Sequence, residues 1–142
     1  MSINDIYGEV LTEHARSNHN KRHLDNPTHV CHGINPSCGD EITLELIEKD
    51  GVIVDASFTG SGCAISLASA SIMIDLIKGK NKNEALKLSD TFFKMIKSEI
   101  KEDKELEILE DAIALKDISH MPARVKCAVL SWHTLTDNFQ KK

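Results

Sequence analysis

Three cysteines and one aspartate in this chain could together bind a metal ion. They lie in three short motifs: NPSCGD at residues 35–40, which holds Cys38 and Asp40; GSGC at residues 60–63, which ends in Cys63; and PARVKC at residues 122–127, which ends in Cys127. Three thiolates and one carboxylate complete a tetrahedral zinc shell. Because a carboxylate is an unusual partner for zinc among thiolates, the set indicates a site that reacts or exchanges ligands, beyond stabilising the fold.

Each motif also has an interpretation without a metal. A glycine lets the chain bend between Cys38 and Asp40, but a loop aspartate beside a cysteine is commonly a turn former. Cys63 either has its thiol pKa lowered at an expected helix start or is a small residue buried at the junction. Arg124, one turn before Cys127, is either a solvated surface charge or a cation that offsets thiolates. Taken singly, the motifs leave both interpretations open.

The other sulfur and imidazole groups are weaker candidates. Cys31 lies on a short expected strand between His29 and His32, and we interpret it as a packing residue. The histidines stand at positions 14, 19, 23, 29, 32, 120 and 133. Their spacing is not typical of a metal site, so we expect most of them at the surface.

Composition argues against several kinds of partner. A net charge of −5 argues against nucleic acid and anionic membranes. The uncharged stretch 56–74 contains two glycines, five serines and a threonine, so it is too polar to cross a membrane. With no visible signal peptide, four cysteines indicate free thiols and a cytoplasmic location. They also lack the C-x-x-C pairs of a zinc ribbon, which argues against a nucleic-acid zinc finger.

The first half of the chain predicts a helix followed by an antiparallel sheet. Residues 2–18 carry an apolar stripe at helical spacing after a capping box formed by Ser2 and Asp5. A short edge strand is expected over 29–34. Two strands over 40–48 and 52–59, joined by a turn, form a hairpin. The inward residues are expected to be Ile42, Leu44 and Leu46 in the first strand and Val52, Val54, Ala56 and Phe58 in the second.

The second half predicts helices only. One helix should run from Cys63 to Lys78 and end at a glycine. Residues 81–117 are charged and helical in pattern, which indicates two or three helices. Pro122 suits the first turn of a final helix that reaches about residue 138. In that helix we expect Val125, Val129, Trp132 and Leu135 on the core face, and Arg124, Cys127 and Ser131 on another. We expect one domain over residues 1–142.

In this order, the motifs resemble the SufU branch of the SufU/IscU/NifU-type iron–sulfur cluster assembly proteins. The resemblance covers roughly residues 6–132 and rests on the segments 35–40, 60–71 and 124–127. Proteins of the IscU type carry a histidine before the third cysteine and a Leu-Pro-Pro-Val-Lys motif upstream. Here Lys126 takes the histidine position, and the upstream residues echo that motif only loosely. The long charged segment before the last cysteine fits an insertion found in the SufU branch.

The resemblance implies an α+β fold, with a three-stranded antiparallel sheet packed against helices. It implies a zinc site formed by Cys38, Asp40, Cys63 and Cys127. The implied activity is that of a zinc-dependent sulfurtransferase. It would take persulfide sulfur from a cysteine desulfurase of the SufS type and pass it to a downstream iron–sulfur scaffold.

Cys38 is our candidate for the sulfur-accepting thiol, because it lies on the most exposed turn. The resemblance implies that a histidine of the desulfurase would displace it from zinc. Arg124 would offset the net negative charge of the ligands. We therefore assign catalytic roles to Cys38 and Arg124, and expect neither nucleic acid nor a membrane as a partner.

Two alternatives stay open. The same thiolates could hold a [2Fe–2S] cluster, which would make the protein a scaffold. Alternatively, the chain could be a non-enzymatic binding module that zinc stabilises. Lys126 in place of histidine favours the sulfurtransferase over the scaffold.

Overall fold

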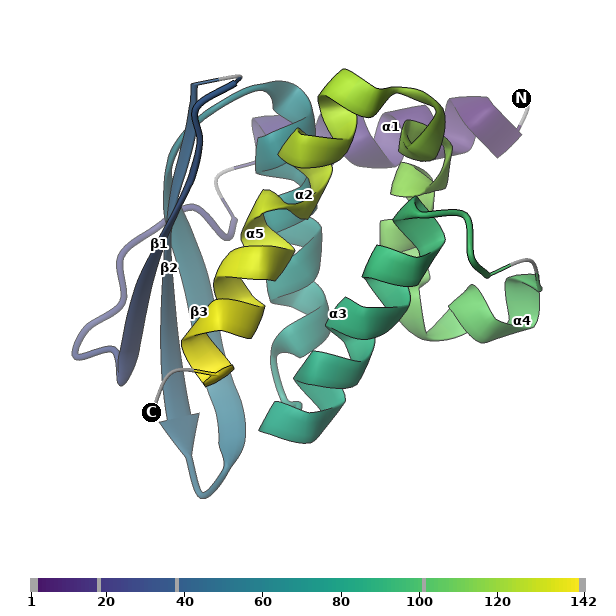
Figure 1. Ribbon diagram of the computed structural model, residues 1–142. Helices are drawn as coiled ribbons and strands as arrows, with labels where there is room; N and C mark the ends of the chain where they lie inside the picture. Colours follow the sequence, from purple (N-terminus) through teal and green to yellow (C-terminus); the bar gives the residue numbers. More distant parts are fainter. Residues whose placement is uncertain (1–2, 18, 38, 101, 141–142) are drawn as a thin grey trace.

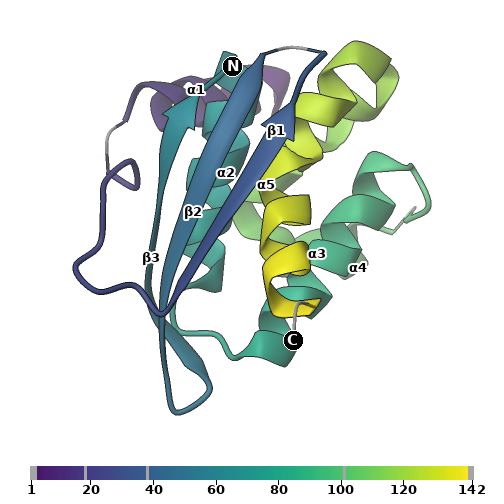
Figure 2. The same cartoon turned by 60° about the vertical axis from the view of Figure 1, so that its left-hand side comes forward.

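An antiparallel sheet of three strands forms one layer of the molecule, and helices cover one of its faces (Figure 1). The computed structural model describes residues 3–17, 19–37, 39–100 and 102–140. The strands are β1 (His29–Asn35), β2 (Asp40–Lys49) and β3 (Val52–Ser61), in the spatial order β1-β2-β3. Figure 2 shows β1 at the sheet edge next to the last helix. Cys38 and the predicted cap Ser2 lie outside the described residues.

The hairpin of β2 and β3 follows from the alternation of apolar residues. Ile42, Leu44 and Leu46 are buried, as predicted. Asp50 and Gly51 form the two-residue turn, with φ of 52° and 80°. Positive φ at both positions is typical of the type I′ turn that matches the twist of the adjoining strands.

The first half of β3 differs from the prediction. Ile47 pairs with Asp55 whereas Glu48 pairs with Ile53, so β3 has one extra residue, Val54, at this point. This bulge reverses the alternation: Ile53 is fully buried and Val54 is 48% exposed. The expectation that Val52 and Val54 point inward was therefore wrong, whereas Ala56 and Phe58 are buried as expected.

The helices also follow the predicted order. They are α1 (Ile3–Arg16), α2 (Ala64–Ile77), α3 (Lys82–Ile96), α4 (Asp103–Leu106), the 3-10 helix η1 (Glu107–His120) and α5 (Pro122–Gln140). The predicted two or three helices of the charged segment are thus α3, α4 and η1. None of the helices in the described part of the chain is both long and apolar enough to cross a membrane.

Helices α2 and α5 pack against the sheet and against each other (Figure 1). Small residues of α2 allow this close approach. Ser69 Oγ donates a 2.6 Å hydrogen bond to the carbonyl of Ala128 and accepts one of 3.0 Å from Nε1 of Trp132. The Trp132 ring stacks on Phe92 of α3, with ring centroids 4.2 Å apart. These contacts fix α5, and with it Cys127, relative to the start of α2.

Helix α5 is buried on more sides than predicted. Trp132 and Leu135 lie in the core, as expected, but Cys127 and Ser131 are just as deeply buried. Val125 and Val129, which were assigned to the core face, are only half-buried. The reason is that α5 lies between β1, α2 and α3, so that much of its circumference meets protein.

Candidate metal centre

Three of the four predicted ligands come together at one end of the sheet. Asp40, Cys63 and Cys127 each offer one ligand atom, and these atoms all lie within 4.8 Å of one another. Asp40 begins β2, Cys63 precedes α2, and Cys127 lies in the second turn of α5. Tetrahedral zinc would place its ligand atoms roughly 3.5–3.8 Å apart, so the separation of these three atoms is compatible with a shared metal ion. The fourth predicted ligand, Cys38, lies outside the described residues.

Asp40 is a buried carboxylate held by hydrogen bonds to both of its oxygens. Oδ1 accepts from the backbone N–H of Cys63 at 2.9 Å, and Oδ2 accepts from Asn35 Nδ2 at 3.2 Å. Burial raises the pKa of Asp40, but hydrogen bonds from Cys63, Cys127, Ser66 and Asn35 outweigh it and hold this pKa below its usual value. The carboxylate therefore stays ionised at neutral pH and is available to a cation.

The two described cysteines of the site differ in position and exposure. Cys63 is the N-cap residue of α2, as predicted, and is half-buried. Cys127 is fully buried. Cys127 lies inside α5, which begins five residues earlier at Pro122, as the predicted start of the last helix implies. Its sulfur is approached by Asn35 Nδ2, at 3.8 Å.

Arg124 lies beside both of these thiols. A hydrogen bond to Cys127, followed by attraction to Cys63 and Cys127, raises the pKa of the Arg124 guanidinium above its usual value. The side chain is exposed, so its charge is screened by water. Arg124 is thus both exposed to water and close to the two thiols, and its role in offsetting their charge stays a prediction.

Gly62 allows the Asp40 carboxylate to reach the site. A Cβ added at Gly62 would lie 2.6 Å from Oδ1 of Asp40. That carboxylate cannot simply move aside, because it is buried and its two oxygens are held by Cys63 and Asn35.

We therefore expect Gly62→Ala to weaken zinc binding by roughly 10- to 100-fold, as changes to groups that orient a metal ligand do. The measurement is competition for zinc with a coloured chelator. Gly8→Ala on α1 is the matched control, since nothing lies within 4 Å of a Cβ there. Equal zinc affinity in both variants would show that the close approach at Gly62 is not needed.

Sequence reasoning missed Asn35 and Ser66 as parts of this site. Asn35 opens the NPSCGD motif and pairs with Asp40 in the β1–β2 register. The predicted edge strand ended at residue 34; extending it by one residue and pairing it with the strand over 40–48 would have placed the two opposite each other. Ser66 donates its hydroxyl to the carbonyl of Cys127 at 3.2 Å, a contact between α2 and α5 that no local pattern indicates. Cys31 is buried and lies outside the cluster, which fits its interpretation as a packing residue.

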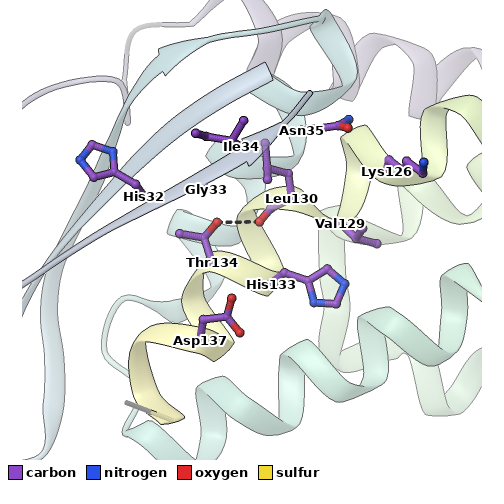
Figure 3. A pocket seen from close by; sticks show the side chains of 10 residues that line it. All are labelled: His32, Gly33, Ile34, Asn35, Lys126, Val129, Leu130, His133, Thr134 and Asp137. Carbon is purple, nitrogen blue, oxygen red and sulfur yellow. Dashed lines mark hydrogen bonds between the residues drawn. The ribbon is translucent and has the colours of Figure 1, made fainter. Parts of the chain in front are cut away.

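A groove of about 430 Å³ runs between β1 and α5 next to the site (Figure 3). Asn35 and Lys126 lie at one end of it, and Asp137 lies at the other. The two elements come close at Gly33, where an added Cβ would overlap Oγ1 of Thr134. The groove therefore opens beside the ligand cluster, on the exposed edge of the sheet.

Comparison with known proteins identifies the family. The NifU-like N terminal domain matches residues 6–136, and the chain belongs to this family. It is 40% identical to the iron-sulfur cluster assembly scaffold protein IscU of Thermotoga maritima, covering 96% of this chain and 94% of that one. It is 39% identical to the zinc-dependent sulfurtransferase SufU of Bacillus subtilis, covering 99% and 94%. The resemblance to the SufU/IscU/NifU family that the motifs indicated is thereby confirmed.

A solved structure agrees with the fold. The crystal structure of a putative iron-sulfur cluster assembly scaffold protein for the SUF system, from Fervidobacterium islandicum AW-1, superimposes with a TM-score of 0.88. The two chains are 34% identical, over 98% of this chain and 100% of that one. The predicted α+β fold, with a three-stranded antiparallel sheet against helices, is confirmed.

Proposed function

We propose that this protein is a zinc-dependent sulfurtransferase of iron–sulfur cluster assembly. It accepts persulfide sulfur from a cysteine desulfurase of the SufS type and passes it to a downstream iron–sulfur scaffold. The observation that carries the proposal is the cluster of Asp40, Cys63 and Cys127, whose ligand atoms lie within 4.8 Å of one another. The name of the Bacillus subtilis relative, a zinc-dependent sulfurtransferase, supports this choice within the family.

The donor set suits zinc. Two thiols and an ionised carboxylate converge, and Cys38 is two residues before Asp40 in the chain. Two residues span at most about 7 Å, so Cys38 is within reach as the fourth ligand. Zinc, when bound, would keep these thiols deprotonated at neutral pH. Arg124 would offset part of the excess negative charge.

Sulfur transfer requires a thiolate that a partner protein can reach. Cys127 is fully buried and Cys63 is half-buried. The residues on either side of Cys38, Ser37 and Gly39, are both exposed. We therefore assign the acceptor role to Cys38, which is also the thiol that we expect a histidine of the desulfurase to displace from the metal.

The transfer step is a thiol–persulfide exchange. The Cys38 thiolate attacks the outer sulfur of the donor persulfide and forms a new S–S bond to it. The S–S bond of the donor breaks, and its electron pair leaves with the donor cysteine as a thiolate. No external oxidant is needed. Free thiols at Cys31 and Cys63 suit a reducing cytoplasm, where we propose that the protein works.

A scaffold for a [2Fe–2S] cluster is the second candidate. It is favoured by the scaffold names of the Thermotoga maritima and Fervidobacterium islandicum relatives. The same thiols would serve as ligands. Lys126, which is exposed at the end of the groove, argues against this role, because an ammonium group is not a ligand for a cluster as a histidine would be.

The two functions differ in the metal that the protein retains. We expect anaerobically purified protein to contain one zinc per chain and to increase the turnover of a SufS-type desulfurase. Stoichiometric iron with a visible cluster spectrum, and little zinc, would support the scaffold instead. Zinc without any effect on the desulfurase would leave only a zinc-stabilised binding module.

A further inference from the structure

We propose that Asn35 is a positioning residue that fixes Asp40 and Cys127 as a permanent pair of metal ligands. The remaining thiols would then be the ligands that leave the metal and are replaced. This inference rests on the proposed zinc site, and it concerns a residue that is not itself a ligand.

The geometry places one amide between two ligand groups. Asn35 is the last residue of β1 and pairs with Asp40 in the register of the sheet. Its Nδ2 lies 3.2 Å from Oδ2 of Asp40 and 3.8 Å from Sγ of Cys127. Asn35 is only 6% exposed, so water cannot readily replace these contacts. Asn35 thus connects β2 to α5 at the end of the groove (Figure 3).

Both contacts favour the charged forms of the ligands. The amide nitrogen carries two hydrogens and can donate to a carboxylate and to a thiolate at once. Hydrogen bonds to an ionised acceptor are stronger than those between neutral groups. With Oδ1 of Asp40 held by the N–H of Cys63 and Oδ2 held by Asn35, the carboxylate cannot rotate freely. A donor bond to the Cys127 sulfur also withdraws charge from it, which makes it a poorer nucleophile.

These contacts divide the site into two parts. Asp40 and Cys127 are both almost fully buried and share the Asn35 amide. They form a fixed base on which a metal stays bound while another ligand leaves. The role of Asn35 is therefore to keep the metal bound while another ligand is exchanged. A contact that only stabilised the fold would not have this effect.

The chain offers a matched control in Asn20. This residue is also fully buried, and its Nδ2 donates to the carbonyl of Ser71 and to Oδ1 of Asp75, both at 2.9 Å. It joins the loop before β1 to α2 and is not part of the ligand cluster. Leucine has the same branched arrangement of heavy atoms as asparagine, is somewhat larger, and has no donor. Asn20→Leu therefore loses the same kind of contacts as Asn35→Leu, at a distinct place.

The test uses the full chain and two readouts that do not depend on activity. Zinc release to a chelator is followed over time, and cobalt-substituted protein is examined by its absorption spectrum. We expect Asn35→Leu and Asn35→Ala to release zinc roughly 10- to 100-fold faster and to shift the cobalt spectrum. Asn20→Leu should lower the melting temperature but leave zinc release and the spectrum as in the unchanged protein.

Two results would overturn the inference. Wild-type release rates and spectra in both folded Asn35 variants would show that the amide does not act on the ligands. Equal acceleration in Asn20→Leu would show that any loss of a buried amide has this effect. Failure of the unchanged protein to bind zinc or cobalt would instead refute the proposed function, and the inference with it.

Discussion

Cys38→Ser should lose persulfide transfer from a SufS-type desulfurase by roughly 1000-fold or more, as removal of a nucleophile does in enzymes. A serine hydroxyl is scarcely ionised at neutral pH and is a poor zinc ligand, so both proposed roles of Cys38 disappear together. The zinc content should fall less than the transfer rate, because Asp40, Cys63 and Cys127 remain. The rate of sulfur transfer and the zinc content are measured on the same sample.

Cys31→Ser is the control for this substitution. Cys31 is a buried residue of β1 outside the ligand cluster. Placing a hydroxyl there should cost about 1–3 kcal/mol of stability, but should leave transfer unchanged at temperatures where the protein is folded. Full activity of Cys38→Ser, with sulfur carried by Cys63 or Cys127, would contradict the assignment of the acceptor.

Removal of zinc should lower the melting temperature by roughly 10 °C or more. A ligand whose free concentration is about 1,000 times its dissociation constant stabilises the folded state by about 4 kcal/mol. Each kcal/mol shifts the melting temperature of a domain of this size by roughly 3–4 °C. The physical reason is local: without a cation, the buried Asp40 carboxylate and the Cys127 thiol are left crowded together. Thermal unfolding with and without a chelator measures the effect.

Zinc added back to the chelated protein should restore the melting temperature, whereas magnesium should not, because magnesium prefers oxygen ligands. A chelated sample that unfolds at the same temperature as the zinc form would mean that the cluster does not stabilise the fold.

Local patterns predicted the hairpin and the order of the elements because each depends on a few neighbouring residues. Alternation in β2 and the Asp50-Gly51 turn determine the β2–β3 pairing. The bulge at Val54 was missed because the apolar run over residues 52–54 fits either phase of a strand. Only the pairing with Glu48 and Ile47 decides which face is buried.

The position of α5 was harder to predict than its existence. Pro122 marks the start of the helix, but burial of Cys127 and Ser131 results from packing on α2 and β1, far away in the sequence. The candidate ligands themselves could be proposed from the motifs, because cysteine and aspartate are residue types that bind metal ions. Their supporting contacts could not, because Asn35 and Cys127 meet only in the folded protein.

The central claim is that a thiol of the proposed zinc site receives sulfur, and peptide mass spectrometry tests it most directly. Zinc-loaded protein is incubated with a SufS-type desulfurase and cysteine, trapped with an alkylating reagent and digested. Cys31 and Cys38 lie on one tryptic peptide, residues 23–49, so its fragment ions are needed to tell them apart. We predict that this peptide gains the mass of one sulfur atom, which the fragments place on Cys38 and not on Cys31, while the peptides with Cys63 and Cys127 gain none. No added sulfur on any of these peptides, under conditions in which the desulfurase turns over, would contradict the claim.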